Sequence, residues 1–204
     1  MRIASRLPVL CIVAILTGTT DLLALNDNRL ERWKSPDGKF AVAEEFYGEG
    51  KRVNGVFIHR RTGVKDRIYP PPSDDLGGAR SLEVKWSANS RYFSVSADRS
   101  KFYGETLVFY VTSAGKPYRV TLPKKLTPAG LEDLIPTSKR DKAGAWFGRA
   151  NLAEKWLPRN RLKLVVGGEV HLLGDNDSTD VERRYLVSFH RGRVVFITTP
   201  ARAK

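Results

Sequence analysis

The sequence predicts an all-β protein that consists of three antiparallel sheet repeats and one short helical insert. Two observations lead to this prediction. Residues 35–40 (SPDGKF) return 52 positions later as residues 87–92 (SANSRY), and the glycine of the following hairpin returns from Gly63 to Gly115. A looser third copy covers about residues 155–199. A fixed period of about 40–50 residues is typical of repeated sheet units.

The amino terminus has the layout of a secretory signal peptide. Arg2 and Arg6 form a basic start, residues 7–16 form an apolar run, and a small residue, Ala24, follows a short polar stretch. A membrane-spanning helix needs about 20 apolar residues, more than this run supplies. We therefore expect residues 1–24 to direct export from a bacterial cell, to the periplasm or beyond, and to make the only membrane contact. An uncleaved anchor helix is the alternative.

Residues 25–204 are expected to form a single β-rich domain without disulfides. The one cysteine, Cys11, lies inside the apolar run of the signal peptide, so the exported part has no thiol for a disulfide or a metal site. Lys and Arg number 35 against 22 Asp and Glu, which gives a formal net charge of +13. Such a charge favours contact with polyanions. Because export makes nucleic acid the least expected polyanion, we expect a protein or an anionic envelope component as the partner, and no nucleic acid.

The first copy is expected to cover residues 34–69. Residues 36–38 (PDG) predict a tight turn, because proline presets its own backbone angle and glycine adopts positive values of φ. Runs of strand-forming residues follow this turn. They predict strands at residues 40–46, 55–60 and 64–69.

The second copy, residues 85–122, gives the clearest strand pattern. Leu82, Val84 and Trp86 alternate with polar residues, a period of two that is typical of a half-buried strand. The short link at residues 113–116 contains glycine and predicts a hairpin between the last two strands. Strands are expected at residues 80–86, 92–96, 105–112 and 117–122. Together they would form a meander that resembles one propeller blade.

The third copy is less regular, and a helical insert separates it from the second copy. Strands are expected at residues 152–157, 162–166, 184–190 and 194–198. The insert is expected over residues 127–153, because Thr127 is a suitable helix cap and Pro128 suits the first helical position. A second short helical piece is expected at residues 146–152.

The turns that open the copies carry a family resemblance. Trp86 is followed by Ser87, two further residues, Ser90, a basic residue and an aromatic residue. Together with two strands and a glycine hairpin, this pattern resembles the repeat of TolB-type and WD-repeat-like β-propellers. Lys34 stands in the first copy where Trp86 and Trp156 stand in the other two. The resemblance implies sheets arranged as blades, a fold that enzymes, scaffolds and receptors all use.

The number of copies leaves the overall arrangement open. Closed propellers typically have four to eight blades, whereas three copies are present here. The sequence is compatible with an open or incomplete propeller, with a sandwich-like packing of the sheets, and with a ring that two chains complete as a homodimer.

No motif in the chain predicts catalysis, so we do not expect an enzyme. A serine nucleophile needs a base in hydrogen-bond reach, and the chain has no Gly-x-Ser-x-Gly elbow. The three histidines share no short metal-binding motif, and no cofactor is expected. The loop with Asp175, Asp177 and Asp180 carries carboxylates of the kind that bind calcium, with a polar hairpin connection as the alternative.

A partner surface is expected in the insert. Trp146 and Phe147 lie near three basic residues, Lys139, Arg140 and Arg149, and interface centres are enriched in such residues. The alternative is that the two aromatic residues pin the insert to a sheet. We therefore expect an exported bacterial envelope protein that acts as a binding or interaction module. A hydrolase acting on an acidic polymer and a structural subunit of an envelope complex are the alternatives.

Overall fold

The computed structural model describes residues 31–47, 52–70, 79–100, 103–174 and 178–199. These residues form twelve strands and three short helical turns, which confirms the predicted all-β class. None of the helices described is long and apolar enough to cross a membrane. The predicted signal peptide, residues 1–24, lies outside the described residues.

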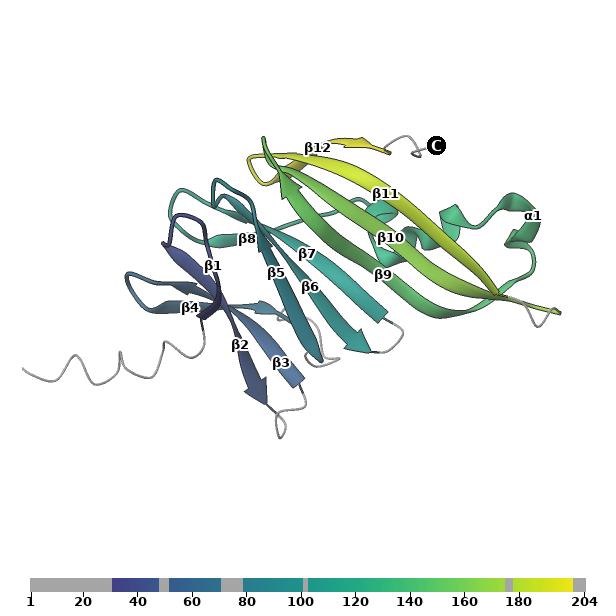
Figure 1. Ribbon diagram of the computed structural model, residues 1–204, viewed down its shortest axis with the longest axis horizontal. Helices are drawn as coiled ribbons and strands as arrows, with labels where there is room; N and C mark the ends of the chain where they lie inside the picture. The colour runs from purple at the N-terminus through teal and green to yellow at the C-terminus, as the bar shows by residue number, and fades with distance from the viewer. Residues whose placement is uncertain (1–30, 48–51, 71–78, 101–102, 175–177, 200–204) are drawn as a thin grey trace, which may run out of the picture.

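Each of the three copies is a four-stranded antiparallel meander (Figure 1). The first copy contains β1 (Glu31–Lys34), β2 (Phe40–Tyr47), β3 (Arg52–His59) and β4 (Val64–Tyr69). The second contains β5 (Ser81–Trp86), β6 (Tyr92–Ser100), β7 (Tyr103–Val111) and β8 (Pro117–Val120). The third contains β9 (Ala143–Leu157), β10 (Arg161–Leu172), β11 (Ser178–His190) and β12 (Arg193–Thr198).

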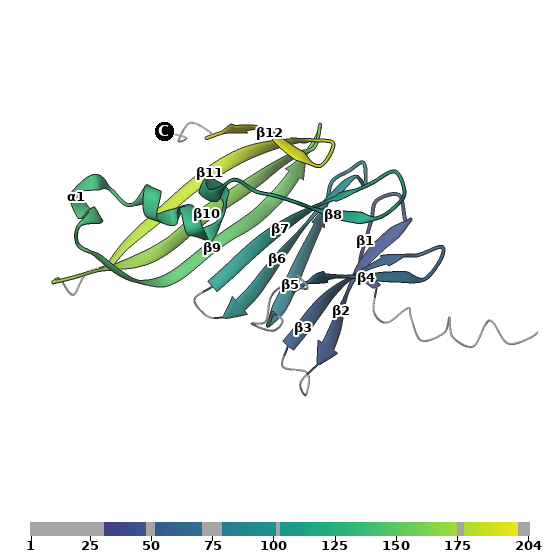
Figure 2. The same cartoon turned by 180° about the vertical axis from the view of Figure 1, so that it is seen from behind.

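The three meanders make up two sheets. Strands β1 to β4 form one sheet, and the other eight strands join in the order β12-β11-β10-β9-β7-β6-β5, with β8 also paired to β7. The joint between the second and third copies is a parallel pairing of β7 with β9, through Tyr103 with Arg149 and Gly104 with Ala150. Figure 2 shows these two meanders side by side from behind. The described strands do not close into a ring.

The insert is less helical than predicted. It contains η2 (Lys124–Leu126), η3 (Pro128–Leu134) and α1 (Thr137–Arg140). The expected helical piece at residues 146–152 was wrong, because these residues belong to the 15-residue strand β9. Pairing with β10, for example of Trp146 with Val170, outweighs the local helix signals. The pairing of β10 with β11 likewise continues through Gly167 and Gly168, so these strands extend beyond their predicted bounds.

The first core layer lies between the first and second copies. Phe93 of β6 stacks on Phe57 of β3, with ring centroids 5.7 Å apart, and on Phe109 of β7 at 4.9 Å. All three side chains are buried. The first copy therefore buries one face of its sheet against the second.

The second core layer lies between the second and third copies. Tyr92 packs against Trp156 of β9 and Phe189 of β11, with ring centroids 5.7 and 5.6 Å apart, and Leu131 of the insert is buried in the same layer. Because Tyr92 and Phe93 are neighbours in β6, their side chains point to opposite faces. The second copy is thus buried on both faces and forms the middle of the molecule.

The turn that opens the first copy is held by Ser35 and Asp37. The Ser35 hydroxyl accepts a hydrogen bond from Phe40 N (3.0 Å) and donates one to Asp37 Oδ1 (2.7 Å), which also accepts from Lys39 N (3.1 Å). Gly38 has a φ of 70°, a value that glycine adopts without strain. The predicted turn is therefore confirmed, and so is the expectation that its glycine adopts a positive φ.

The turn of the second copy repeats this arrangement with other side chains. The Ser87 hydroxyl accepts from Tyr92 N (2.9 Å) and contacts Asn89 Oδ1 (2.9 Å), which accepts from Arg91 N (3.1 Å). Ser90 takes the place of the turn glycine, with a φ of 57°. The 52-residue period of the sequence is therefore also a period of individual hydrogen bonds.

Successive copies are joined by a recurring indole hydrogen bond. Trp86 Nε1 donates to Trp33 O (3.2 Å), and Trp156 Nε1 donates to Lys85 O (3.0 Å). Trp33 and Lys85 are 52 residues apart, so the two acceptors occupy the same place in their copies. At both junctions, a tryptophan side chain thus donates a hydrogen bond to the same backbone position of the preceding copy.

The opening turns also stack on one another along one rim. Asp37 N donates to Ser90 Oγ (3.0 Å), and Asn89 Nδ2 donates to Asn160 Oδ1 (2.8 Å) of the turn between β9 and β10. These two contacts join the first turn to the second and the second to the third. The three turns therefore lie along the rim in the same order as the copies follow one another in the sequence.

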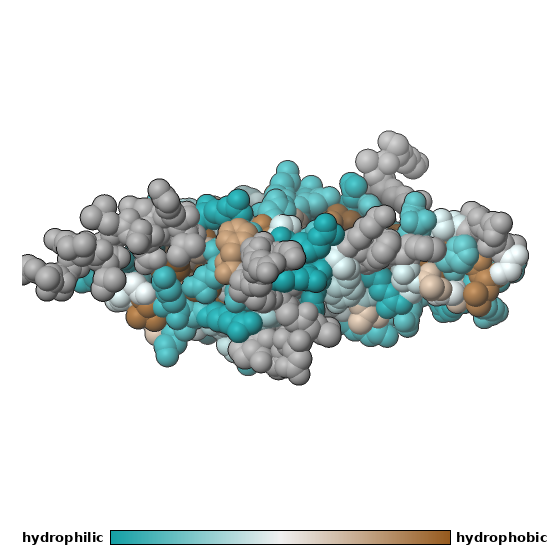
Figure 3. All heavy atoms as spheres, turned by 90° about the horizontal axis from the view of Figure 1, so that it is seen from below, coloured by the Kyte–Doolittle hydropathy of each residue, from teal (hydrophilic) through white to brown (hydrophobic). Residues whose placement is uncertain are grey.

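The third copy exposes charged residues together with the apolar side chains of Leu152 and Phe196. Arg184 of β11 pairs with Glu182 (3.1 Å) and lies 3.9 Å from Glu154 of β9. Seen from below, the hydrophobic residues of the surface form small separate patches among hydrophilic ones (Figure 3).

Replacing either turn serine should destabilise the protein to a similar extent. In Ser35→Ala and Ser87→Ala a buried backbone N–H loses its acceptor, which costs about 1–3 kcal/mol. Urea denaturation measures this change, with the exposed Ser138→Ala as the control, for which about 0.5 kcal/mol or less is expected. A neutral result for one of the two turns would contradict their equivalence.

Acid should remove part of the stability of the first turn. Partial burial raises the pKa of Asp37. Hydrogen bonds from the Ser35 side chain, the Lys39 backbone and the Ser90 side chain outweigh burial and hold the pKa below its ordinary value. A lowered pKa in the folded state stabilises above the unfolded value of about 3.9, and this contribution is lost as the pH falls through the folded pKa.

The variant Asp37→Asn tests this contribution, because Asn89 performs the same role in the second turn without a charge. The difference in urea midpoint between the wild type and Asp37→Asn should shrink between pH 6 and pH values below about 3.9. A difference that stays constant over this range would show that the Asp37 charge does not contribute.

Candidate functional site

An open groove lies where the second and third copies join. Among the described residues, backbone pairing of β7 with β9 is limited to Tyr103 with Arg149 and Gly104 with Ala150, and all four of these residues line the groove. The groove has a volume of about 490 Å³ and is bordered by β5, β6, β7, β9 and β10. Its lining includes Ser81, Leu82, Glu83, Ser96, Ala97, Asp98, Ser100, Tyr103, Gly104, Gly148, Arg149, Ala150, Leu152, Gly167 and Gly168.

Small residues form the floor of the groove. Two of these residues, Gly168 and Gly148, are glycine for different physical reasons. A Cβ at Gly168 would lie 2.1 Å from Gly148 O, so the close approach of β9 and β10 requires glycine at this position. A Cβ at Gly148 would meet nothing within 4 Å. Packing therefore does not require glycine at position 148, and its missing side chain leaves the groove open.

The charged groups of the groove have both signs. The Arg149 guanidinium lies 4.7 Å from the ring centroid of Trp146, and both residues are half-buried. Glu83 and Asp98 are exposed on the opposite side, and Glu83 pairs with Lys85 (2.9 Å). The arrangement suits a ligand with polar groups of both signs better than a simple anion.

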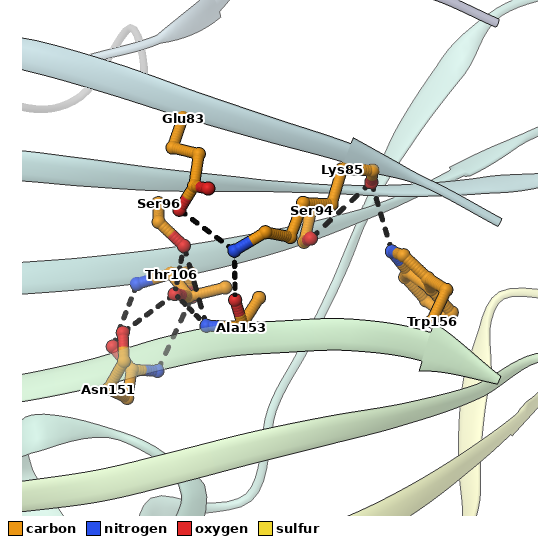
Figure 4. A network of polar contacts seen from close by, with 8 residues as sticks. All are labelled: Glu83, Lys85, Ser94, Ser96, Thr106, Asn151, Ala153 and Trp156. Atoms are coloured by element: carbon orange, nitrogen blue, oxygen red, sulfur yellow. Dashed lines mark hydrogen bonds and ion pairs between the residues drawn. The ribbon is translucent and has the colours of Figure 1, made fainter.

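A buried polar network supports the groove from below (Figure 4). The Thr106 hydroxyl donates to Asn151 O (2.6 Å), while Asn151 Oδ1 accepts from Thr106 N (2.7 Å). Asn151 Nδ2 donates to Leu126 O (2.8 Å), which ties the insert to the same point. Because the Thr106 hydroxyl is committed as a donor, the Ser96 hydroxyl donates to it over 2.8 Å. Such a satisfied network rigidifies the joint between the copies.

Lys85 links the network to the wall of the groove (Figure 4). Its Nζ donates to Ala153 O (2.7 Å) and pairs with Glu83, while its backbone oxygen accepts the Trp156 indole N–H. The side chain thus crosses from β5 to β9 and fixes the distance between the two strands that flank the groove.

The first junction has a related polar contact that the sequence reading missed. Glu44 of β2 is buried, accepts a hydrogen bond from Leu82 N (3.1 Å) and pairs with Arg32. Ser96, which is 52 residues after Glu44, accepts from Ala153 N (3.4 Å) at the second junction. Polar residues at this shared repeat position are the signal in the sequence that could have revealed both contacts.

The predicted partner surface is only partly assembled. Arg149 is among the residues that line the groove, and its guanidinium lies over the ring of Trp146. Trp146 packs against the second core layer and is not among the lining residues, as expected if it pins this segment to a sheet. Phe147 lies in the same strand, but its side chain is outside the described part of the structure.

The two other predicted residues have separate roles in α1. Lys139 Nζ donates to Thr179 Oγ1 (2.8 Å) of β11, and the exposed Arg140 donates to Ile135 O (3.3 Å). Neither residue is among the described residues that line the groove. Arg149 is therefore the predicted basic residue that belongs to the candidate site.

The calcium prediction stays a prediction. Asp180 is exposed in β11, and in the strand pairing its backbone lies opposite that of Glu169 in β10. Asp175 and Asp177 lie outside the described residues. Among the residues that the structure describes, no three His, Cys, Asp or Glu side chains gather as metal ligands.

No protein-family model matches the chain, and no curated protein matches its sequence. The resemblance to TolB-type and WD-repeat-like propellers therefore stays a prediction from the repeated turn.

The two glycines of the groove should respond differently to a methyl group. Gly168→Ala forces a side-chain carbon onto a backbone oxygen, and overpacking of this kind costs about 1–3 kcal/mol. Gly148→Ala should leave stability unchanged or raise it by about 0.5–1 kcal/mol, because alanine loses less conformational entropy than glycine in a strand. Thermal denaturation of both variants makes the comparison, and equal effects would contradict the assigned roles.

Proposed function

We propose that the protein is a binding module of the bacterial cell envelope and that an extended segment of a partner protein binds in the groove between the second and third copies. The observation that carries this proposal is the groove itself, about 490 Å³ in volume and open at Gly148. Binding sites are concave and combine apolar lining with a few well-placed polar groups.

The lining favours a polypeptide as the occupant. The floor of glycine, alanine and serine residues lets another main chain approach closely, because few side chains intervene. Tyr103 and the exposed Leu152 supply apolar contacts, and Arg149 and Asp98 can pair with charged side chains of either sign. The signal-peptide pattern at the amino terminus supports the proposed location in the periplasm or outside the cell.

Hydrolysis of an acidic polymer is the second candidate function. Glu83 and Asp98 line the same groove, and glycoside cleavage uses two carboxyl groups. Both residues are exposed, however, and Glu83 pairs with Lys85, whereas a general acid needs surroundings that favour its protonated form. Binding therefore accounts for the groove better than catalysis.

A photocrosslinking experiment tests the proposal. A photoreactive amino acid replaces Leu152, which is 49% exposed and lines the groove, in cells that make the full chain. We expect one discrete adduct with a partner protein, and we expect Gly148→Leu to abolish it by filling the groove.

The matched control is Ala145→Leu, an exposed position in the same strand that is not among the residues lining the groove. This variant should leave the adduct unchanged. An adduct that survives Gly148→Leu, or the absence of any adduct, would contradict binding in the groove.

A further inference from the structure

A second cavity lies between the first and second copies, beside their stacked opening turns. It has a volume of about 400 Å³. The first copy contributes Phe40 and His59 to its lining, and the second contributes Arg91, Val111 and the hairpin residues 112–115. None of these residues lines the groove at the second junction.

Arg91 points from the second copy toward this cavity. Tyr92, the next residue, packs against the third copy, so Arg91 shares the opposite face with Phe93. Phe93 stacks on Phe57 of the first copy. Val111, whose backbone N–H donates to Arg91 O (2.8 Å), belongs to the same first core layer. Arg91 and Val111 therefore form the wall of the cavity that faces the first copy.

Phe40 and His59 form the wall that faces the second copy. Their rings meet edge to face, with centroids 5.3 Å apart. A Cβ at Gly115 of the second copy would lie 3.2 Å from His59 Cδ2 and 3.4 Å from Phe40 Cε1. Both rings thus reach the hairpin of the second copy, and the two walls face each other across the cavity.

The equivalent place at the second junction holds a tyrosine hydroxyl. Tyr92 stands 52 residues after Phe40, and its hydroxyl accepts a hydrogen bond from Gly192 N (3.0 Å) in the hairpin of the third copy. Phe40 has no hydroxyl, and Gly115 N donates within its own hairpin, to Thr112 O (3.0 Å). The first junction therefore lacks the hydroxyl that ties the hairpin to the preceding copy at the second junction.

The cavity carries an uncompensated positive charge. Arg91 is exposed, and its side chain forms no hydrogen bond or ion pair with the described residues. Asp37 and Lys39 also line the cavity, but their charged groups lie 3.9 Å apart and compensate each other. Among the described lining residues, Arg91 is therefore the charge that a ligand can neutralise.

His59 adds a hydrogen-bond donor. Its Nδ1 is buried and has no hydrogen-bond partner among the described residues. A hydrogen on Nδ1 would have no acceptor, so the structure favours the tautomer with its hydrogen on Nε2. Nε2 would lie 3.4 Å from a Cβ at Gly115, on the hairpin side of the cavity, where it can donate to a bound group.

We propose that this cavity binds a small organic acid, whose carboxylate pairs with the Arg91 guanidinium and accepts a hydrogen bond from His59 Nε2. Guanidinium groups bind carboxylates through two parallel hydrogen bonds. The volume lies within the range of small-molecule sites. Thr112 and Ser113 line the same cavity with hydroxyl groups, which suits an acid that carries hydroxyl groups of its own.

Inorganic phosphate fits this cavity less well. A phosphate group carries close to two negative charges near neutral pH, whereas the lining described here offers Arg91 as its uncompensated cation. A carboxylate carries one charge and matches it.

Imidazole resonances in NMR spectra test the proposal, because His59 lines the cavity while His171 and His190 do not. The full chain is titrated at constant pH with sodium acetate, sodium glucuronate and neutral glucose. We expect saturable shifts of the His59 resonances with both acids, unchanged His171 and His190 resonances, and no shift with glucose. For glucuronate we expect a Kd on the order of 1 mM.

Two variants separate the charge from the space. Arg91→Gln should weaken glucuronate binding about tenfold, because it removes the cation that pairs with the carboxylate. Phe40→Tyr should also weaken binding, since it brings the hydroxyl of the second junction into the cavity without changing the charge.

The matched control is Arg183→Gln, which removes the same charge from an exposed position of β11 that does not line the cavity. It should bind glucuronate like the wild type. Melting temperatures show that all variants fold.

Four outcomes would overturn the proposal. The first is the absence of a saturable His59 shift with both acids, and the second is tighter binding of inorganic phosphate than of acetate. The third is an equal loss of affinity in Arg91→Gln and Arg183→Gln, which would indicate a general charge effect. The fourth is unchanged affinity in Phe40→Tyr, which would place the ligand elsewhere. None of these results concerns the groove at the second junction, so the proposed protein-binding function is tested separately.

Discussion

The contact between successive copies is a tryptophan indole that donates a hydrogen bond to a backbone oxygen of the copy before it. Trp86 makes this contact with Trp33, and Trp156 makes it with Lys85. A single repeat unit cannot bury its apolar face alone, so each copy depends on its neighbour. The indole bond fixes the register in which the apolar faces meet.

The groove of the second junction arises from a difference between the two junctions. Glu44 reaches across the first junction with a long side chain, while Ser96 takes the same repeat position at the second with a short one. The short side chain lets the neighbouring strands approach, and β7 pairs with β9 at Gly104 and Ala150, which both line the groove. Small residues continue along the floor, and a Cβ at Gly148 would meet nothing within 4 Å, so side chains leave the groove open. The candidate site is therefore a consequence of how the sheet is joined.

Much of the fold could be predicted because its signals are local. The opening turns, the hairpin glycines and the period-two strands of the second copy all depend on residues close in sequence. The first part of β9, up to residue 151, could not be predicted in this way, since Thr127 and Pro128 give helix signals that hold only as far as a short 3₁₀ turn. A Cβ at Gly130 would lie 2.4 Å from Lys124 O, and this close packing of the insert is a tertiary effect. Arg149 was found as a candidate residue, but its place beside Tyr103 depends on strand pairing across 46 positions of the chain.

Native-state hydrogen exchange tests the central claim, that the second and third copies form one cooperative unit through their polar junction. The amides of Thr106 and Ala153 donate to side chains across this junction. The account predicts that both amides exchange with the same opening free energy as the buried core of β6, because the junction opens only when the whole unit unfolds. A lower opening free energy throughout β9 to β12 would mean that the third copy opens independently, and it would contradict the account.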